Sequence, residues 1–176
     1  MSTSAITLEV LPAGFGDSVL LSCPAGDRTW RMLIDTGPDE AYPALRARLA
    51  ELPLGPNGKR HMDLFIVSHI DHDHIGGASL LLNDQSLQLS FGDIWFNAPP
   101  RPTARGVAEG ESLAKLLGAT ERALPWNLVF EGKPISTSGP GEHVELTWPD
   151  IPRVTVGSPR CTRASANRMS SGLCGA

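Results

Sequence analysis

The residue types that could do chemistry in this chain are concentrated between residues 68 and 77, which read S-H-I-D-H-D-H-I-G-G. Five of the six residues from His69 to His74 carry an imidazole or a carboxylate, and three of the chain's five histidines lie there. Imidazoles and carboxylates crowded at the end of an apolar segment would be costly to desolvate unless a cation lay between them. The segment therefore predicts a metal site.

Four side chains of this segment have the chemistry and the spacing of metal ligands. A divalent ion needs several deprotonated donors at about 2.0 to 2.2 Å, and a strand end followed by a tight loop can aim residues i, i+2, i+4 and i+5 at one point. Those positions hold His69, Asp71, Asp73 and His74. The mixed set suits Zn²⁺, Mn²⁺ or Fe²⁺, and its carboxylates favour manganese more than an all-histidine site would. The sequence leaves the metal's identity open.

Metal-assisted hydrolysis is the chemistry that such a site predicts. A divalent ion held there would make water reactive near neutral pH and polarise a carbonyl or phosphoryl oxygen of a substrate, so no protein nucleophile is required. Asp73 is the candidate catalytic residue, because its carboxylate could orient the attacking hydroxide or protonate the leaving group. The alternative is a solvated loop that is merely rich in His and Asp.

The elements that must position this segment alternate between strands and helices in the first half of the chain. The apolar run L-F-I-V at residues 64–67 predicts a buried strand over 63–67 that ends where the metal segment begins. The other expected elements are a hairpin over 6–10 and 18–22, a strand over 30–34, an amphipathic helix over 42–52 capped by Asp39, helices over 78–82 and 111–117, a strand over 93–96, and a late strand pair over 144–148 and 154–156.

The composition is that of one globular domain without obvious export or membrane signals. Of 176 residues, 41% are hydrophobic and 19% charged, and the net charge of −4 without a Lys/Arg cluster gives no electrostatic support for sequence-independent nucleic-acid binding. The three cysteines lack C-x-x-C spacing, and no stretch approaches the roughly 20 apolar residues of a membrane span. We therefore expect a cytoplasmic protein with reduced thiols and no membrane partner.

Three segments of the chain resemble the metallo-β-lactamase superfamily. Residues 68–77 are similar to its signature S/T-H-x-H-x-D-H-x-G-G, with Asp71 in the place of the second histidine. This variant, together with G-F-G-D at 14–17 and L-I-D-T-G at 33–37, resembles the branch that contains the metallo-hydrolase domain of the DNA-uptake protein ComEC and its stand-alone relatives. The resemblance spans about residues 6 to 158.

The resemblance implies an α/β fold, the αββα sandwich, in which helices flank two sheets and one or two divalent metal ions, zinc or manganese, lie at the sheet edge. By the family pattern, His69 and Asp71 would serve the first metal, and Asp73 and His74 the second.

Other polar residues are weaker candidates for the same site. The resemblance places Asp17 and Asp35 near the metals as supporting or loop residues, although a turn former and a strand terminator explain them equally well. His72 lies between the ligand positions and is expected to point away. His143 is the remaining candidate ligand late in the chain, where a surface histidine at a strand start is the commoner situation.

The C-terminal part departs from the family pattern. Members complete the site with a bridging aspartate in a G-D motif and usually a late histidine, and neither is evident here. We therefore expect a partial domain over 1–158 that holds only the N-terminal half of the sandwich, followed by an unstructured tail over 159–176. Self-association would then cover exposed strand faces around Trp95, Trp126 or Trp148.

Three functions are compatible with these residues. The first is a metal-dependent hydrolase acting on a phosphodiester, in a nucleic acid or a nucleotide, which is the substrate class that the ComEC resemblance implies. The second is a truncated, non-catalytic remnant or binding module of the same fold. The third is a lactam or thioester hydrolase, which differs only in substrate, and no residue of the sequence decides between these substrates.

Overall fold

A computed structural model describes residues 5–97, 107–119, 123–135, 143–146 and 154–157. These residues belong to two compact units, of which the first contains everything described through Ile135. The second contains strands β6 (His143–Leu146) and β7 (Val154–Gly157), which pair antiparallel with Val144 opposite Val156. The predicted late strand pair is therefore present, whereas Trp148 and the predicted tail over 159–176 lie outside the described residues.

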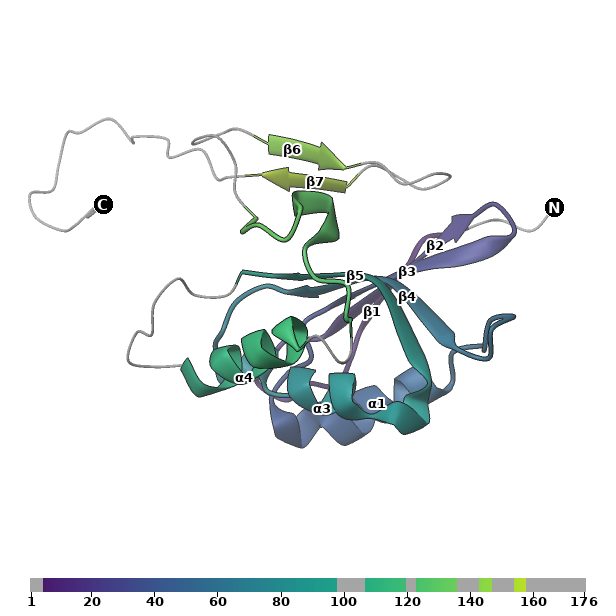
Figure 1. Cartoon of the computed structure of the whole chain (residues 1–176). Helices are drawn as coiled ribbons and strands as arrows, with labels where there is room; N and C mark the ends of the chain where they lie inside the picture. Colours follow the sequence, from purple (N-terminus) through teal and green to yellow (C-terminus); the bar gives the residue numbers. More distant parts are fainter. Residues whose placement is uncertain (1–4, 98–106, 120–122, 136–142, 147–153, 158–176) are drawn as a thin grey trace, which may run out of the picture. The chain divides into compact units, whose positions relative to one another are not determined.

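A five-stranded mixed sheet forms the framework of the first unit (Figure 1). Neighbouring strands follow the chain order, namely β1 (Thr7–Val10), β2 (Val19–Ala25), β3 (Arg28–Ile34), β4 (Arg60–Val67) and β5 (Leu89–Phe96). The first three strands are antiparallel and the last three are parallel. Because parallel neighbours need a crossover connection, helical segments separate β3, β4 and β5 in the chain. All the strands predicted in this region are present, and β4 and β5 start earlier than predicted.

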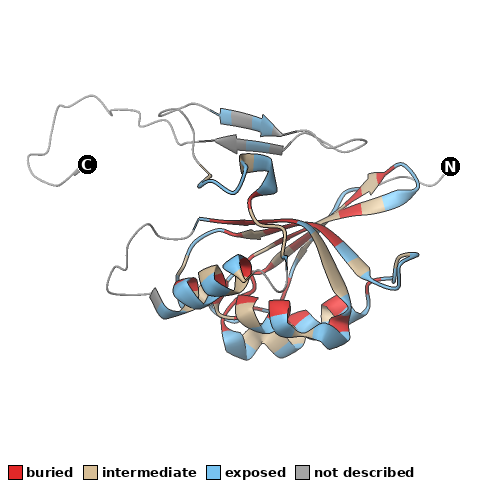
Figure 2. Ribbon diagram, in the orientation of Figure 1, coloured by how far each residue is buried: buried red, intermediate tan, exposed pale blue. Residues whose placement is uncertain are grey.

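Helices cover one face of this sheet, as Figure 1 shows for α1, α3 and α4. The helical elements are η1 (Asp39–Ala41), α1 (Tyr42–Ala50), α2 (His72–Ile75), α3 (Ala78–Asn83), η2 (Gln85–Leu87), α4 (Val107–Gly118) and η3 (Leu128–Phe130). The core on this helix-covered face is a set of buried apolar side chains from strands and helices, including Leu20, Leu33, Phe65 and Ile94 from the sheet and Leu45, Leu49, Leu81, Leu113 and Leu117 from the helices. Figure 2 shows these buried positions on the inner sides of the helices.

The helix boundaries correct two details of the sequence prediction. Asp39 does not cap α1; it starts the short turn η1, and α1 begins without a side-chain cap, with Pro43 in its first turn. Helix α4 begins at Val107 rather than at residue 111. None of the helices in the described residues is long and apolar enough to cross a lipid bilayer.

The opposite face of the sheet is also apolar, but it is covered unevenly. Register places Leu8, Leu21, Met32 and Leu64 in one row across four strands, and Val10, Val19, Ile34, Ile66 and Trp95 in the next row across all five. At the β1 edge, Ile6, Leu8 and Val10 are 58%, 63% and 76% exposed. At the β5 edge, Trp95 is buried and packs edge-to-face against Phe130, with 5.3 Å between ring centroids. The expectation of an exposed Trp95 is therefore wrong, and self-association stays a prediction.

Asp93 explains why Trp95 is covered. Its buried carboxylate accepts hydrogen bonds from the backbone N–H groups of Ile94, Leu128 and Val129 and from Trp95 Nε1, at 2.9 to 3.2 Å. The first residues of η3 are thereby attached to β5. A buried carboxylate is costly unless such donors satisfy it, so the segment and the carboxylate depend on each other.

Replacing Asp93 should destabilise the fold without touching the predicted site. Asp93→Asn replaces an acceptor oxygen by an N–H₂ group that faces N–H donors, so we expect the free energy of unfolding to fall by about 3 kcal/mol. Urea unfolding followed by tryptophan fluorescence measures this. Asp27→Asn, an exposed turn position, is the control, and equal stabilities of the two variants would contradict the role given to Asp93.

Asp84 connects helix α1 to the turn η2 through hydrogen bonds of its side chain. Its carboxylate accepts from Ser86 Oγ and from Ser86 N (3.0 Å), from the Tyr42 hydroxyl (2.7 Å) and from Arg46 Nε (2.8 Å). The hydrogen bonds from Ser86 and then from Tyr42 hold the pKa of Asp84 well below its usual range. Burial, followed by the hydrogen bond to Asp84, raises the pKa of the Tyr42 hydroxyl.

The lowered pKa of Asp84 predicts an acid-dependent contribution to stability. A carboxyl group whose folded-state pKa is depressed stabilises the protein above its unfolded pKa of about 3.9, and this contribution is lost as the pH falls through the folded pKa. We therefore expect Asp84→Asn to lower the free energy of unfolding by about 2 kcal/mol at pH 7. The difference in the free energy of unfolding between Asp84→Asn and the wild type should become smaller below about pH 4. Unfolding curves across pH measure it, with Glu111→Gln as the control; a gap independent of pH would contradict the assignment.

Candidate metal centre

The candidate site lies where β3 and β4 end side by side. Ile34 is paired with Ile66, and the first residues after the two parallel strands, Asp35 after β3 and Ser68 after β4, therefore emerge at the same edge. The backbone N–H of Asp35 still donates to Ile66 O at 2.9 Å, so the sheet fixes the separation of the two chain segments. The metal segment predicted from the sequence starts at this edge.

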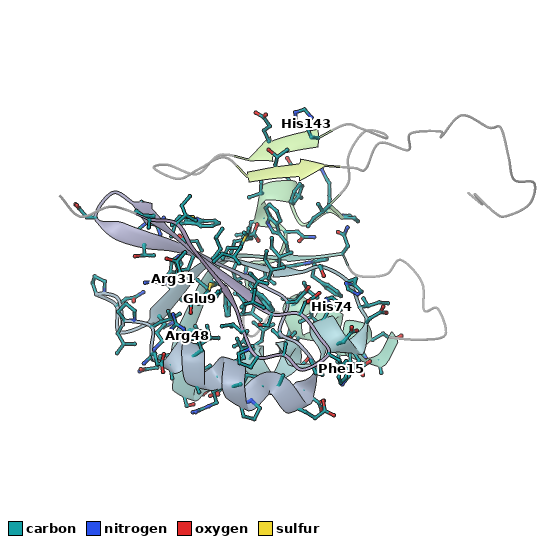
Figure 3. All side chains as sticks on the ribbon, turned by 180° about the vertical axis from the view of Figure 1, so that it is seen from behind. Glu9, Phe15, Arg31, Arg48, His74 and His143 are labelled. Atoms are coloured by element: carbon teal, nitrogen blue, oxygen red, sulfur yellow. The ribbon has the colours of Figure 1, made fainter. Side chains whose placement is uncertain are left out.

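Backbone hydrogen bonds join three loops around the edge. Asp17 N donates to Asp73 O at 3.1 Å, and Gly37 N donates to Asp17 O at 2.8 Å. Thr36 donates to His74 O through its backbone N–H at 3.0 Å and through Oγ1 at 3.1 Å. The loop before β2, the turn after β3 and the metal segment thus form one unit, and Figure 3 shows Phe15 and His74 in the same region.

Two glycines are required by the close approach of these loops. A Cβ atom on Gly16 would lie 2.0 Å from Asp73 O, and one on Gly76 would lie 2.7 Å from Asp39 N and 2.8 Å from Pro38 Cα. Real Cβ atoms do not approach backbone so closely, so a larger residue at either position would push the loops apart. This explains a glycine of G-F-G-D and the first glycine of the G-G pair.

Asp35 is a buried carboxylate with three donors. It is 2% exposed, and its oxygens accept from Ser68 N (2.7 Å), Ser68 Oγ (2.5 Å) and His74 Nδ1 (3.0 Å). Its φ of 56° is in the left-handed region, which aspartate tolerates better than most residues. Asp35, His69 and His74 have ligand atoms within 4.8 Å of one another, but the oxygens of Asp35 already accept these hydrogen bonds. We therefore place Asp35 as a support for the ligands and not as a ligand.

The four predicted ligands come together at this edge. His69, Asp71 and Asp73 each offer a ligand atom, all within 4.8 Å of one another. The rings of His69 and His74 are 3.6 Å apart between centroids, and His74 Nε2 is 3.4 Å from Asp73 Oδ2. In the described part of the chain, no lysine or arginine forms an ion pair with either carboxylate. Two carboxylates that face imidazoles alone fit a cation bound among them.

The remaining candidates differ in how they relate to this cluster. Asp17 lies at its border, with Oδ2 3.7 Å from His74 Nδ1. His72 points elsewhere, as predicted: its ring nitrogens lie 3.2 Å from Asp39, 3.7 Å from Glu40 and 3.5 Å from Glu109. His143 belongs to the second unit, where its Nε2 is 3.7 Å from Glu145 Oε1, and its role as a ligand stays a prediction.

Sequence reasoning overlooked two residues that lie beside the cluster, Ser68 and Phe15. Ser68 is the first residue of the signature and contacts both Asp35 and His69, the latter with Oγ 3.0 Å from Nδ1. Phe15 is 78% exposed and neighbours Gly16, which contacts the carbonyl of Asp73. An apolar residue between two glycines in a turn was the available signal for Phe15; no local pattern identifies the partners of Ser68.

Removing one ligand should abolish tight metal binding, and the motif supplies its own matched control. We expect His69→Ala to weaken zinc or manganese binding by more than about 100-fold, because it removes a donor next to both ligand carboxylates. His72→Ala deletes the same side chain three residues away, where it faces another set of carboxylates, and should bind metal like wild type. Elemental analysis and titration of the metal-stripped proteins measure this; equal losses in both variants would contradict the assigned ligands.

One comparison with known proteins identifies the family of this chain. The family model described as the metallo-beta-lactamase superfamily matches residues 12–157, which include every strand from β2 to β7 and the whole cluster. No curated protein gave a match. The mixed α/β architecture with its five-stranded sheet is consistent with the fold of that family. The chain belongs to the metallo-beta-lactamase superfamily.

Proposed function

We propose that this protein is a metal-dependent hydrolase that cleaves a phosphodiester bond in a nucleic acid or a nucleotide. The observation that carries the proposal is the convergence of His69, Asp71, Asp73 and His74 at the carboxyl edge of parallel strands. Membership of a superfamily of generally metal-dependent hydrolases supports the reaction class. The substrate class is supported by the resemblance of the S-H-x-D-x-D-H-x-G-G form to the ComEC branch.

The chain's own residues divide the work in this proposal. His69, Asp71 and His74 hold one or two divalent ions, zinc or manganese, together with Asp73. When bound, such an ion supplies Lewis acidity and makes water nucleophilic near neutral pH. Asp73, one third exposed, is placed to orient the attacking water or to give a proton to the leaving oxygen.

Two features beside the cluster support a phosphodiester substrate, whereas the net charge of the chain opposes it. His69 and Asp71 are exposed, so a chain as bulky as a nucleic acid can approach the ligand edge. Phe15 presents an exposed aromatic ring in the loop that contacts Asp73, and such rings stack on nucleobases. The protein's net charge is −4, which repels phosphate, so positive charge from the bound ion has to compensate.

A metal-binding module without catalysis is the second candidate. The observation that favours it is that all four ligands come from one segment of six residues, while family members add a bridging aspartate and a late histidine from elsewhere. Among the described residues of the first unit, no late histidine joins the cluster, and Asp35, which lies within reach of His69 and His74, already accepts hydrogen bonds. An incomplete ligand set weakens metal affinity and leaves the substrate poorly oriented.

Hydrolysis of a simple phosphodiester separates these candidates. We expect the manganese- or zinc-loaded protein to hydrolyse bis(p-nitrophenyl) phosphate, and Asp73→Asn to lower kcat by about 100-fold or more, because the amide is a weaker metal ligand than the carboxylate and cannot accept or deliver the proton. Release of p-nitrophenolate measures the rate, with His72→Ala as the control that should keep wild-type activity.

Each possible result of this experiment favours a different function. Metal binding without hydrolysis of any phosphodiester would favour the binding module. Hydrolysis of a β-lactam or a thioester at a higher kcat/KM than the phosphodiester would keep the reaction class and overturn the substrate. Equal activity of wild type and Asp73→Asn would contradict the role of Asp73.

A further inference from the structure

Ser68 lies between the buried carboxylate and the first histidine of the cluster. Its Oγ is 2.5 Å from Asp35 Oδ2 and 3.0 Å from His69 Nδ1, and its backbone N–H donates to Asp35 Oδ1 at 2.7 Å. The same Asp35 Oδ2 is 3.0 Å from His74 Nδ1. One carboxylate therefore contacts the second histidine directly and the first histidine through a single hydroxyl group.

Counting protons along this chain fixes the direction of each hydrogen bond. An ionised carboxylate only accepts hydrogen bonds, and a serine hydroxyl has a single proton to donate. Because that proton goes to Asp35, Ser68 Oγ can only accept from His69. A neutral imidazole carries its proton on one of its two nitrogens, so His69 must carry it on Nδ1. The direct contact with Asp35 requires the same of His74.

The other edges of the two rings face the ligand carboxylates. His69 Nε2 is 3.6 Å from Asp71 Oδ2, and His74 Nε2 is 3.4 Å from Asp73 Oδ2. Both rings thus turn Nδ1 toward Asp35 or Ser68 and Nε2 toward the place where the ligand oxygens gather. The unprotonated Nε2 atoms are the ones that a metal ion needs.

We propose that Ser68 is a positioning residue that transmits the negative charge of Asp35 to His69 and thereby holds this histidine as the Nδ1–H tautomer. A single buried carboxylate then orients both metal-binding imidazoles, one directly and one through Ser68. This inference rests on the proposed function in one respect, namely that His69 and His74 bind the metal through Nε2.

The rigidity of the sheet makes this relay effective. Asp35 and Ser68 are the first residues after the neighbouring parallel strands β3 and β4, and the N–H of Asp35 donates to the carbonyl of Ile66. The distance between the carboxylate and the hydroxyl is therefore set by strand pairing and not by a flexible loop. Removing the hydroxyl frees His69 to rotate and to carry its proton on either nitrogen, which lowers the fraction ready to bind a metal.

Nuclear magnetic resonance of the metal-stripped, full-length protein tests the relay directly. At a pH above the imidazole titration, two-bond correlations between ring nitrogens and carbons identify the protonated nitrogen of each histidine. We expect Nδ1–H for both His69 and His74 in the wild type. In Ser68→Ala, His69 should change partly or wholly to Nε2–H while His74 stays the same, and Ser68→Thr should restore the wild-type pattern because it keeps the hydroxyl.

The chain offers a matched control for this change. Ser90 Oγ is 3.1 Å from Nδ1 of His61, outside the candidate site, so Ser90→Ala removes an equivalent contact. It should leave the signals of His69 and His74 unchanged. Zinc affinity, measured by competition with a chromophoric chelator, should fall by about 10- to 100-fold in Ser68→Ala, as expected for loss of a residue that supports a ligand, and should not fall in Ser90→Ala.

The possible failures are distinguishable. An Nε2–H tautomer of His69 in the wild type would overturn the relay even if Ser68→Ala failed to fold, because that measurement needs no variant. An unchanged zinc affinity in Ser68→Ala would overturn the positioning role. The expected tautomers in a protein that binds no zinc or manganese would support the relay and contradict the proposed function.

Discussion

The carboxylate of Asp35 is the constraint on which the candidate site depends. A charge at a position only 2% exposed is tolerated when donors surround it, and here the donors are Ser68 and His74 from the segment after the neighbouring strand. Satisfying Asp35 therefore fixes two positions of the metal segment at once, Ser68 and His74. The parallel pairing of β3 and β4 makes this possible, because it brings the residues after both strands to one edge.

The sequence predicted the strands and the ligand segment because both leave local signals. Apolar runs of strand length marked β2, β3 and β4, and the i, i+2, i+4, i+5 spacing marked the four residues that the structure brings together. The sequence alone does not decide the role of Asp35, since its partners Ser68 and His74 are 33 and 39 residues away. A strand terminator and a buried support look the same until the register of the sheet is known.

The errors have the same origin in contacts distant along the chain. Asp39 is of a residue type that often caps helices, and it precedes α1 in the sequence. In the structure it starts the short turn η1 instead, and its carboxylate lies 3.2 Å from Nε2 of the distant His72. Trp95 was expected at an exposed face, but Asp93 attaches the non-periodic segment around η3 to β5 and so covers it. Helix α2 is only four residues long, too short for periodicity to reveal it.

Exposure increases stepwise from the support to the outermost ligand. The side chain of His74 is 13% exposed, that of His69 is 43% exposed and that of Asp71 is 68% exposed. Each step outward leaves a side chain with more rotamer freedom to lose when a metal binds, and that loss opposes binding. Asp71, where the family signature has a histidine, is the least restrained of the three. The less exposed pair, Asp73 and His74, therefore loses less side-chain freedom when an ion binds. His69 is more exposed, so burial restrains its ring less, and the contact with the Ser68 hydroxyl matters most there.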